Sequence, residues 1–420
     1  MDKLFLKNSI IYLGSSILNK AIPFLLLPVF TKYLTPSEYG VLAIFQLVLT
    51  FYTAFIGMNS HANISKQFYK YSKSQVAKLI GNILLIVSIF SVIFLAITFA
   101  VTSYFNDIFS IPSHWLQVMP LLSFMFMVNI INLTVLRNEE KAYLFGMFEI
   151  ANTAVNMMVT VVLLVVFHYG WYSQAIGISI AYFVFFIISL SFLKKKGYLS
   201  FDFDREEIRS ILIISLPLIP HTLGGIVINM SDRLFIEKMI SLEMVGIYSV
   251  GYVFGMVVML FTDAFIKAWS PWFYKNLAEP SDRKKREIVQ YTYIYIIGLF
   301  ILTVLISTLG SVVLPYFVDE KFHAAKEFVF WIALGYAVRG VYQIFFPYLV
   351  HIGKTSFLAI STIVAAIINL FLNYFLINLY GAVGAAFATI IAFFVAGLLV
   401  FWYQNKHYYM PWFWKGENNA

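Results

Sequence analysis

Long apolar segments follow one another along the whole sequence, and they constrain its fold more than any other feature. Each holds roughly 20 or more residues, and about 20 helical residues cross a hydrocarbon layer of ~30 Å. Lipid offers no partner for unpaired backbone groups, so each segment is expected to be an α-helix. The predicted spans are 9–31, 41–63, 79–101, 115–136, 142–166, 174–193, 210–235, 246–266, 289–310, 327–347, 355–377 and 382–403. The sequence therefore predicts an all-α integral membrane protein with 12 transmembrane helices.

The composition excludes several classes of function. Hydrophobic residues make up 61% of the chain and charged residues 12%, whereas soluble domains carry about 25% charged residues. The absence of Cys excludes disulfides and thiolate chemistry, and no two of the seven His residues lie at the i, i+4 spacing of a helical metal site. The loops predicted outside the membrane are short. We expect no enzyme activity, no catalytic residues, no cofactor and no metal.

The basic residues predict the orientation in the membrane. With the N-terminus inside, 22 of the 29 Lys and Arg residues fall in cytoplasmic segments and four in outer loops. Cytoplasmic loops carry the excess of positive charge in membrane proteins, so both termini are predicted to be cytoplasmic. The net charge of +8 is thus expected to face anionic lipid headgroups, and no nucleic acid partner is predicted.

The longest predicted inner loop, 194–209, separates six spans from six. The segment from Lys32 to Val41 resembles the segment from Lys238 to Ile247 at an offset of 206 residues. Six helices in each half make both halves enter the membrane from the same side, as in transporters built from parallel repeats. We expect two pseudo-symmetric six-helix lobes around a central cavity, residues 1–200 and residues 201–420, the second including the cytoplasmic tail.

Lys20 lies near the middle of the first predicted span. It is about 11 residues, or about 16 Å, from either end, too far for its ammonium to reach an interface. A charge at mid-bilayer costs about 2.5–3.5 kcal/mol on insertion scales, so it is expected to face a cavity or a partner. A structural lysine bonded to neighbouring carbonyls is the alternative. The cavity interpretation is favoured.

Two arginines extend this pattern. Arg339 lies about 12 Å from the inner end of its span, where it either reaches the interface or faces a cavity. Arg233 lies near the outer end of its span and can extend to the interface, while its neighbour Asp232 is expected to point elsewhere on the helix. Asp263 is expected to pair with Lys267 one turn away. Together the deep basic residues favour a cationic cavity for an anionic substrate such as a phosphate or pyrophosphate.

Helix-breaking residues occupy corresponding first helices of the two halves. Pro23 and Pro28 lie in the first span, and Pro217 and Pro220 lie in the seventh. Broken helices at matched positions predict a site or a hinge. Ordinary tolerance of Pro in membrane helices is the competing explanation.

A cation site is a weaker hypothesis from the same region. Asn369 and Asn373 follow one face of the eleventh span, and Thr389 lies on the twelfth. With Asp232, these side chains have the oxygen ligands that a small coupling cation needs. Interhelical hydrogen bonding is the more common role of such residues.

Several segments resemble polysaccharide flippases of the Wzx type, members of the superfamily of multidrug, oligosaccharidyl-lipid and polysaccharide exporters. The resemblance covers the whole chain. The most specific segment runs from Pro28 to Gly40. The others are Leu136-Arg137, Ser215 to Pro220, Ser231 to Arg233 and Tyr380 to Ala385.

This resemblance implies two six-helix lobes that alternate between inward and outward openings. It implies a polyprenyl-pyrophosphate-linked oligosaccharide as substrate, an O-antigen, capsule or exopolysaccharide repeat unit, moved across the bacterial cytoplasmic (inner) membrane during polysaccharide or lipopolysaccharide biosynthesis. The expected partners are this substrate, membrane lipids and the polysaccharide assembly proteins, and the chain is expected to be a monomer. Arg137 joins Lys20, Arg233 and Arg339 as a candidate substrate-binding residue.

Two other functions stay open. A cation-coupled multidrug exporter would share the fold, but such exporters typically use a membrane acid in the first half, where this chain has Lys20. A membrane glycosyltransferase or polymerase would generally need a sizeable outer loop with catalytic residues. Some relatives bind sodium among helices 7, 11 and 12, whereas no acid lies in the last two spans here.

Overall fold

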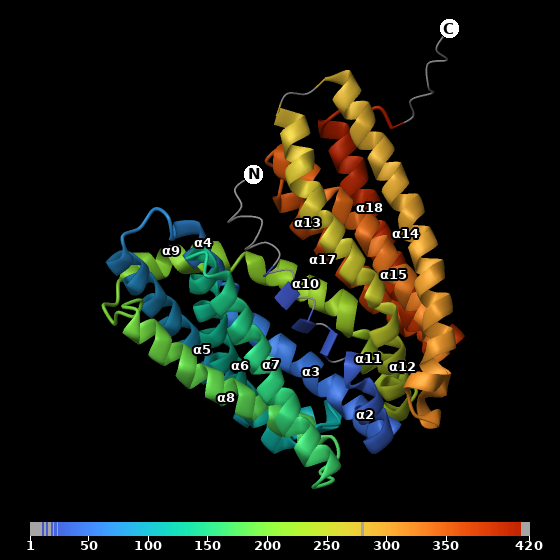
Figure 1. Ribbon diagram of the computed structural model, residues 1–420, viewed down its shortest axis with the longest axis horizontal. Helices are drawn as coiled ribbons and strands as arrows, with labels where there is room; N and C mark the ends of the chain where they lie inside the picture. Colours follow the sequence, from blue (N-terminus) through green and yellow to red (C-terminus); the bar gives the residue numbers. More distant parts are fainter. Residues whose placement is uncertain are drawn as a thin grey trace. The chain divides into compact units, whose positions relative to one another are not determined.

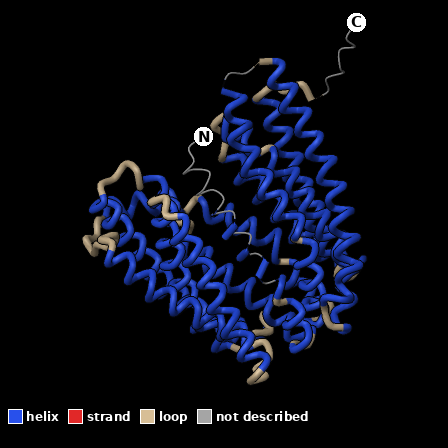
Figure 2. Tube along the Cα trace, in the orientation of Figure 1, coloured by secondary structure: helices blue, strands red, loops and turns tan. Residues whose placement is uncertain are grey.

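The computed structural model describes residues 11–412, apart from residues 12, 13, 16, 17, 20, 23, 279 and 280, and for residues 103–108 and 278 it describes the backbone alone. Every regular element in this part of the chain is helical (Figure 2). Eleven helical segments of the described residues are long and apolar enough to cross a bilayer. They coincide with the last eleven predicted spans, and the first span, 9–31, lies partly outside the described residues. The protein is an all-helical, multi-pass membrane protein.

The chain forms two compact units, Met1–Ile226 and Val227–Ala420. In Figure 1 the helices of the first unit run from blue to green, and those of the second from yellow-green to red. The predicted pseudo-symmetric lobes, with their boundary at residue 200, stay a prediction.

In the first unit, α6 packs against α3, α5 and α8. Helix α3 begins sharply because Thr35 forms a capping box with Glu38 and Pro36 occupies the first turn. It ends at Met58, whose left-handed backbone closes the last turn. The helices of this unit are α2 (Leu27–Tyr33), α3 (Pro36–Gly57), α4 (His61–Gln67), α5 (Lys73–Ile108), α6 (Ser113–Asn138), α7 (Ala142–Val165), α8 (Tyr172–Lys195) and α9 (Arg205–Ser215).

In the second unit, α15 packs against α12, α13, α14 and α18. The approach of α12 is close, because a Cβ added at Gly255 would lie 2.7 Å from Ile332. After α10 (Leu218–Met230), which passes from one unit into the other, the elements are α11 (Asp232–Met239), α12 (Leu242–Gly255), α13 (Val257–Ala278), α14 (Asp282–Phe317), η1 (Glu320–Ala325), α15 (Lys326–Ile344), α16 (Phe346–His351), α17 (Ser356–Tyr380) and α18 (Val383–His407).

The seventh predicted span, 210–235, is three helices rather than one. The first interruption, between α9 and α10, lies at Leu216 and Pro217, and the second lies at Ser231. Pro220 lies in the first turn of α10, where a missing backbone donor costs little. Pro28 similarly lies in the first turn of α2. These interruptions are compatible with hinges, but the hinge role of the prolines stays a prediction.

Candidate functional site

At Ser231, inside the second unit, α10 ends and α11 begins. Asp232 begins α11, and its Oδ1 accepts a hydrogen bond of 2.9 Å from the backbone N–H of Arg233. A carboxylate is favourable here, because the free N–H groups of a helix start carry partial positive charge.

Asp232 and Arg233 form a buried ion pair at this point. The guanidinium Nη1 lies 2.9 Å from Asp232 Oδ1 and donates a second bond of 3.0 Å to the carbonyl of Asn229. Tyr248 on α12 donates to Asp232 Oδ2 at 2.7 Å. Asp232 is 1% exposed and Arg233 6%. Both expectations for Arg233 were wrong. Its side chain is buried in this unit, and its guanidinium contacts the carboxylate of Asp232, which precedes it in the first turn of α11.

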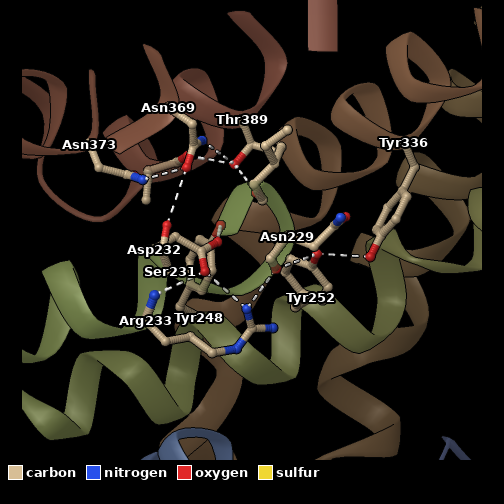
Figure 3. A network of polar contacts seen from close by, with 12 residues as sticks. Asn229, Ser231, Asp232, Arg233, Tyr248, Tyr252, Tyr336, Asn369, Asn373 and Thr389 are labelled. Atoms are coloured by element: carbon tan, nitrogen blue, oxygen red, sulfur yellow. Dashed lines mark hydrogen bonds and ion pairs between the residues drawn. The ribbon is translucent and has the colours of Figure 1, made fainter. Parts of the chain in front are cut away.

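Tyrosines extend the site from Arg233 toward α15. The guanidinium lies over the ring of Tyr252, 4.3 Å from its centroid, a distance typical of a cation–π contact. The Tyr252 hydroxyl donates to the Asn229 carbonyl at 3.0 Å, and the Tyr336 hydroxyl donates to Tyr252 at 2.8 Å. Figure 3 shows these side chains converging on the interrupted segment.

On the other side of Ser231, amide and hydroxyl groups from α17 and α18 complete the network (Figure 3). Asn369 Oδ1 accepts hydrogen bonds from the Ser231 hydroxyl at 3.2 Å and from Asn373 Nδ2 at 3.1 Å. Thr389 accepts a bond of 3.5 Å from Asn369 and donates at 3.4 Å to the carbonyl of Ile228. Asn373 Oδ1 is buried and has no hydrogen-bond partner among the described residues.

A cavity of about 10 Å³ lies within this network, which is about the space that one water molecule requires. Polar groups face it from several helices, among them Asn229, Tyr248, Tyr252, Tyr336 and Thr389. Of the predicted cation-coupling residues, Thr389 lines this cavity, and Asn369 and Asn373 are joined to it by hydrogen bonds. The carboxylate of Asp232 is bonded to Arg233 and Tyr248 instead.

Arg339 belongs to a second, more open pair. Its Nη1 lies 3.5 Å from Asp263 Oδ1 on α13, and the two side chains are 21% and 24% exposed. The guanidinium also lies 5.9 Å from the ring centroid of Tyr336, which links it to the network described above. Close packing beside it is ensured by Gly340, where an added Cβ would lie 2.6 Å from Thr262. Besides any contact with Lys267 one turn away, Asp263 thus has an interhelical partner that the sequence did not indicate.

The remaining sequence candidates lie elsewhere. Arg137 lies in the last turn of α6 in the first unit, where its exposed side chain is 3.5 Å from the Ser65 hydroxyl. Lys20 and Pro23 lie outside the described residues.

Sequence reasoning missed the three tyrosines of the network. A tyrosine within an apolar span needs a partner for its hydroxyl, and Tyr248 and Tyr252 are spaced to share a helix face. This signal was available, but the chain holds 27 tyrosines, and their spacing does not single out these ones.

Comparisons with known proteins assign the fold and the family. The profile of a family described as polysaccharide biosynthesis protein matches residues 5–277. The chain belongs to this family. A second profile, MatE, matches residues 217–375.

Relatives with curated sequences match along most of their length. "Lsg locus putative protein 1" of Haemophilus influenzae is 24% identical over 378 residues, which cover 86% of this chain and 88% of that protein. An "uncharacterized membrane protein" of the same organism is 23% identical and covers 87% and 88%.

Solved structures agree in fold. The inward-facing conformation of a multidrug resistance MATE family transporter of the MOP superfamily has a TM-score of 0.72 at 14% identity, over 92% of this chain and 94% of that one. An outward-facing conformation has a TM-score of 0.62 at 15% identity, over 96% and 95%. The protein thus belongs to a polysaccharide biosynthesis family and has the fold of the MATE transporters.

Proposed function

We propose that this protein translocates an anionic polyprenyl-pyrophosphate-linked oligosaccharide across the cytoplasmic membrane by alternating access. The family supports a role in polysaccharide biosynthesis. The basic residues Lys20 and Arg339, which lie within apolar spans, support the anionic class of substrate. The repeat unit would belong to an O-antigen, a capsule or an exopolysaccharide.

The exposure of Arg339 is the observation that carries this proposal. Arg233 is buried and its charge is matched by Asp232, so we assign it to holding the interrupted helix. Arg339 keeps 21% of its side chain exposed and contacts Asp263 at 3.5 Å, the outer limit of a hydrogen bond. A phosphate group would offer this guanidinium shorter and stronger contacts. We propose that Arg339, with Lys20 and Arg137, attracts the pyrophosphate.

Flipping of purified lipid-linked oligosaccharide in proteoliposomes tests this role. Arg339→Gln removes a charge-assisted contact worth about 1.5–3 kcal/mol, so the flipping rate at low substrate is expected to fall roughly 10-fold to 100-fold. Lys326→Gln is the matched control, since it removes an exposed charge from the first residue of the same helix. Equal rates for the two variants would contradict a substrate role for Arg339.

Lys20 is tested in cells. Lys20→Ala is expected to abolish surface polysaccharide without loss of protein from the membrane, and Lys20→Arg is expected to retain some activity. The physical reason is the mid-membrane depth of its charge. Full polysaccharide production by Lys20→Ala would remove Lys20 from the proposed site.

The membrane potential is the proposed energy source. The cell interior is negative, so each unit of negative charge moving outward gains about 2.3 kcal/mol per 100 mV. Asp232 is already paired with Arg233, which leaves Asn369, Asn373 and Thr389 to bind a cation only weakly. We propose that a sodium or proton gradient assists transport without being obligatory.

A potassium diffusion potential, imposed on the proteoliposomes without sodium or proton gradients, tests this coupling. The flipping rate is expected to rise when the potential favours export of the anion and to fall when its sign is reversed. Flipping that ignores the sign and size of the potential, yet responds to a sodium or proton gradient, would show that the coupling proposal is wrong.

The proposed location is the bacterial inner membrane with both termini in the cytoplasm. Its proposed partners are the lipid-linked oligosaccharide, the surrounding lipids and the proteins of polysaccharide assembly, and we propose that the transporter itself is a monomer.

Export of cationic drugs is the second candidate, because the similar solved structures include multidrug transporters. Efflux of a cationic dye from cells that express the chain separates the two functions. The flippase proposal expects no efflux above the vector control.

A further inference from the structure

An apolar pocket of about 240 Å³ opens in the second unit between α14, α15 and α18. Its volume lies below the ~300–1,000 Å³ of pockets that enclose drug-sized ligands, so it has space for part of one hydrocarbon chain. Aromatic and aliphatic side chains supply most of the wall, among them Tyr293, Tyr342, Phe345, Phe401 and Trp412.

Three of the four polar side chains of the wall have partners, whereas the indole Nε1 of Trp412 is buried without a hydrogen-bond partner among the described residues. The Tyr293 hydroxyl donates to the carbonyl of Trp412, and the Tyr342 hydroxyl is 3.0 Å from Thr362 Oγ1. Thr292 donates at 2.8 Å to the carbonyl of Ile288 within its own helix. Apart from the Trp412 indole, these polar side chains are already engaged, so a hydrocarbon chain in the pocket would cost them no hydrogen bond.

The segment after α18 forms one end of the pocket. Gln404 Nε2 donates at 2.8 Å to the carbonyl of Tyr408, and this bond holds the segment against the end of α18. The ring of Trp412 then packs against Tyr293, Phe345 and Phe401, with centroid separations of 6.3, 5.7 and 5.3 Å.

Basic side chains lie at the same end of these helices. Lys285 on α14 has its Nζ 5.0 Å from the ring centroid of Tyr408 and 5.8 Å from that of Tyr409. It precedes the wall residue Thr292 by two helical turns, about 10 Å along the axis. Lys406 Nζ lies 5.7 Å from the ring centroid of Trp402, which is itself 58% exposed.

We propose that this pocket binds one acyl chain of an anionic phospholipid from the surrounding bilayer, with the headgroup against Lys285 and Lys406. Moving a chain from bilayer to protein gains little hydrophobic free energy, because both surroundings are apolar. Selection among phospholipids must then come from the headgroup. Each lysine near the surface is expected to favour an anionic lipid over a zwitterionic one about fivefold. This site is independent of the proposed transport function.

Native mass spectrometry of the full chain, released from nanodiscs of phosphatidylethanolamine and phosphatidylglycerol, tests the site. The wild type is expected to retain more phosphatidylglycerol than phosphatidylethanolamine. Gly397→Phe should abolish this retention by filling the pocket, since an added Cβ meets nothing closer than Tyr342 at 3.7 Å. The matched control, Gly298→Phe on α14, places the same ring where a Cβ has no neighbour within 4 Å and should retain the lipid.

Lys285→Gln is expected to lower the preference for phosphatidylglycerol about fivefold while a chain is still bound. Crosslinking of wild type to phosphatidylglycerol with a diazirine on its acyl chain should label α14 or α18 beside the pocket, which keeps the test informative if Gly397→Phe misfolds. Equal retention of both lipids by the wild type, or labelling elsewhere, would overturn the proposal. Displacement of phosphatidylglycerol by an equal amount of undecaprenyl phosphate would also overturn it, by assigning the pocket to a polyprenyl chain.

Discussion

At the scale of single residues, the second unit is organised around a carboxylate whose two oxygens are both used. Asp232 Oδ1 accepts from Arg233, and Oδ2 accepts from Tyr248. Removing one partner of a buried ion pair typically costs about 3–5 kcal/mol, because the other charge stays buried without compensation. The pair therefore stabilises this fold only as long as both members are present.

Tyr248→Phe tests the contribution of the hydroxyl. It leaves the ring in place but removes the bond to Asp232 Oδ2, and a lost bond to a buried charged group costs about 1–3 kcal/mol. The melting temperature of the purified protein is expected to fall. Tyr316→Phe, at a position 89% exposed, should leave it unchanged, and identical melting of both variants would contradict the role assigned to Tyr248.

Part of this site was predictable from residue types. Asp232, Asn369, Asn373 and Thr389 are polar residues in apolar spans, and the structure joins them in one network. The contact of Arg233 with Asp232 was not predictable, because adjacent residues of a continuous helix face apart. The interruption at Ser231, directly before this pair, carries no Pro or Gly that would indicate it in the sequence.

At the scale of elements, hydrogen bonds and an ion pair hold the connection between α8 and α9 against α5. Asn82, fully buried on α5, donates at 2.7 Å to Glu207 and accepts at 3.0 Å from the backbone of Asp204. Lys78 lies 3.1 Å from the carboxylate of Asp204, which also caps α9.

The Lys78 contact and the bonds from the start of α9 hold the pKa of Asp204 below its usual value. Because folding lowers this pKa, the stabilisation is complete above the usual carboxyl pKa. It is lost as the pH falls through the lowered value.

Asn82→Ala should loosen this connection. Losing the bonds of a buried amide costs about 1–3 kcal/mol, so trypsin should cleave more rapidly in the connection between α8 and α9, which contains Lys196 and leads to Arg205. Ser88→Ala is the control, since it removes a bond to Leu84 within α5. Unchanged cleavage of Asn82→Ala would show that Asn82 does not hold this connection.

The apolar segments located the spans well, because each must be long enough to cross the bilayer. They underestimated the lengths of some of the helices that contain these spans. Helices α5 and α14 each hold 36 residues, or about 54 Å, whereas the sequence predicted 79–101 and 289–310. The extra turns at the starts of the two helices, 73–78 and 282–288, are mostly polar and lie before the apolar segment. Apolarity therefore gives no signal for the helical structure of these first turns, whereas residues 311–317 at the end of α14 are apolar and the predicted span ended too early.

At the scale of the whole molecule, the eleven described spans show a multi-pass membrane protein, and its family is one of polysaccharide biosynthesis. The direction in which the chain crosses the membrane is predicted from the sequence alone. The excess of basic residues in alternate loops is the argument for cytoplasmic termini. This argument requires that the first predicted span, 9–31, crosses the membrane, because the side assigned to every later loop depends on it.

Reporter fusions test this orientation. Fusions at Asn59 and Ala420 are expected to report the cytoplasm, and a fusion at Ser110 the outside, because 22 of the 29 basic residues then lie inside. An external C-terminus would change the number of spans.

The pairing of two consecutive side chains also restricts how this protein can evolve. Because a single loss at Asp232 or Arg233 leaves its neighbour as an uncompensated buried charge, either one-step change passes through a destabilised ancestor. Homologous proteins should therefore keep both residues or have both replaced, so that substitutions at these two positions are expected to occur together.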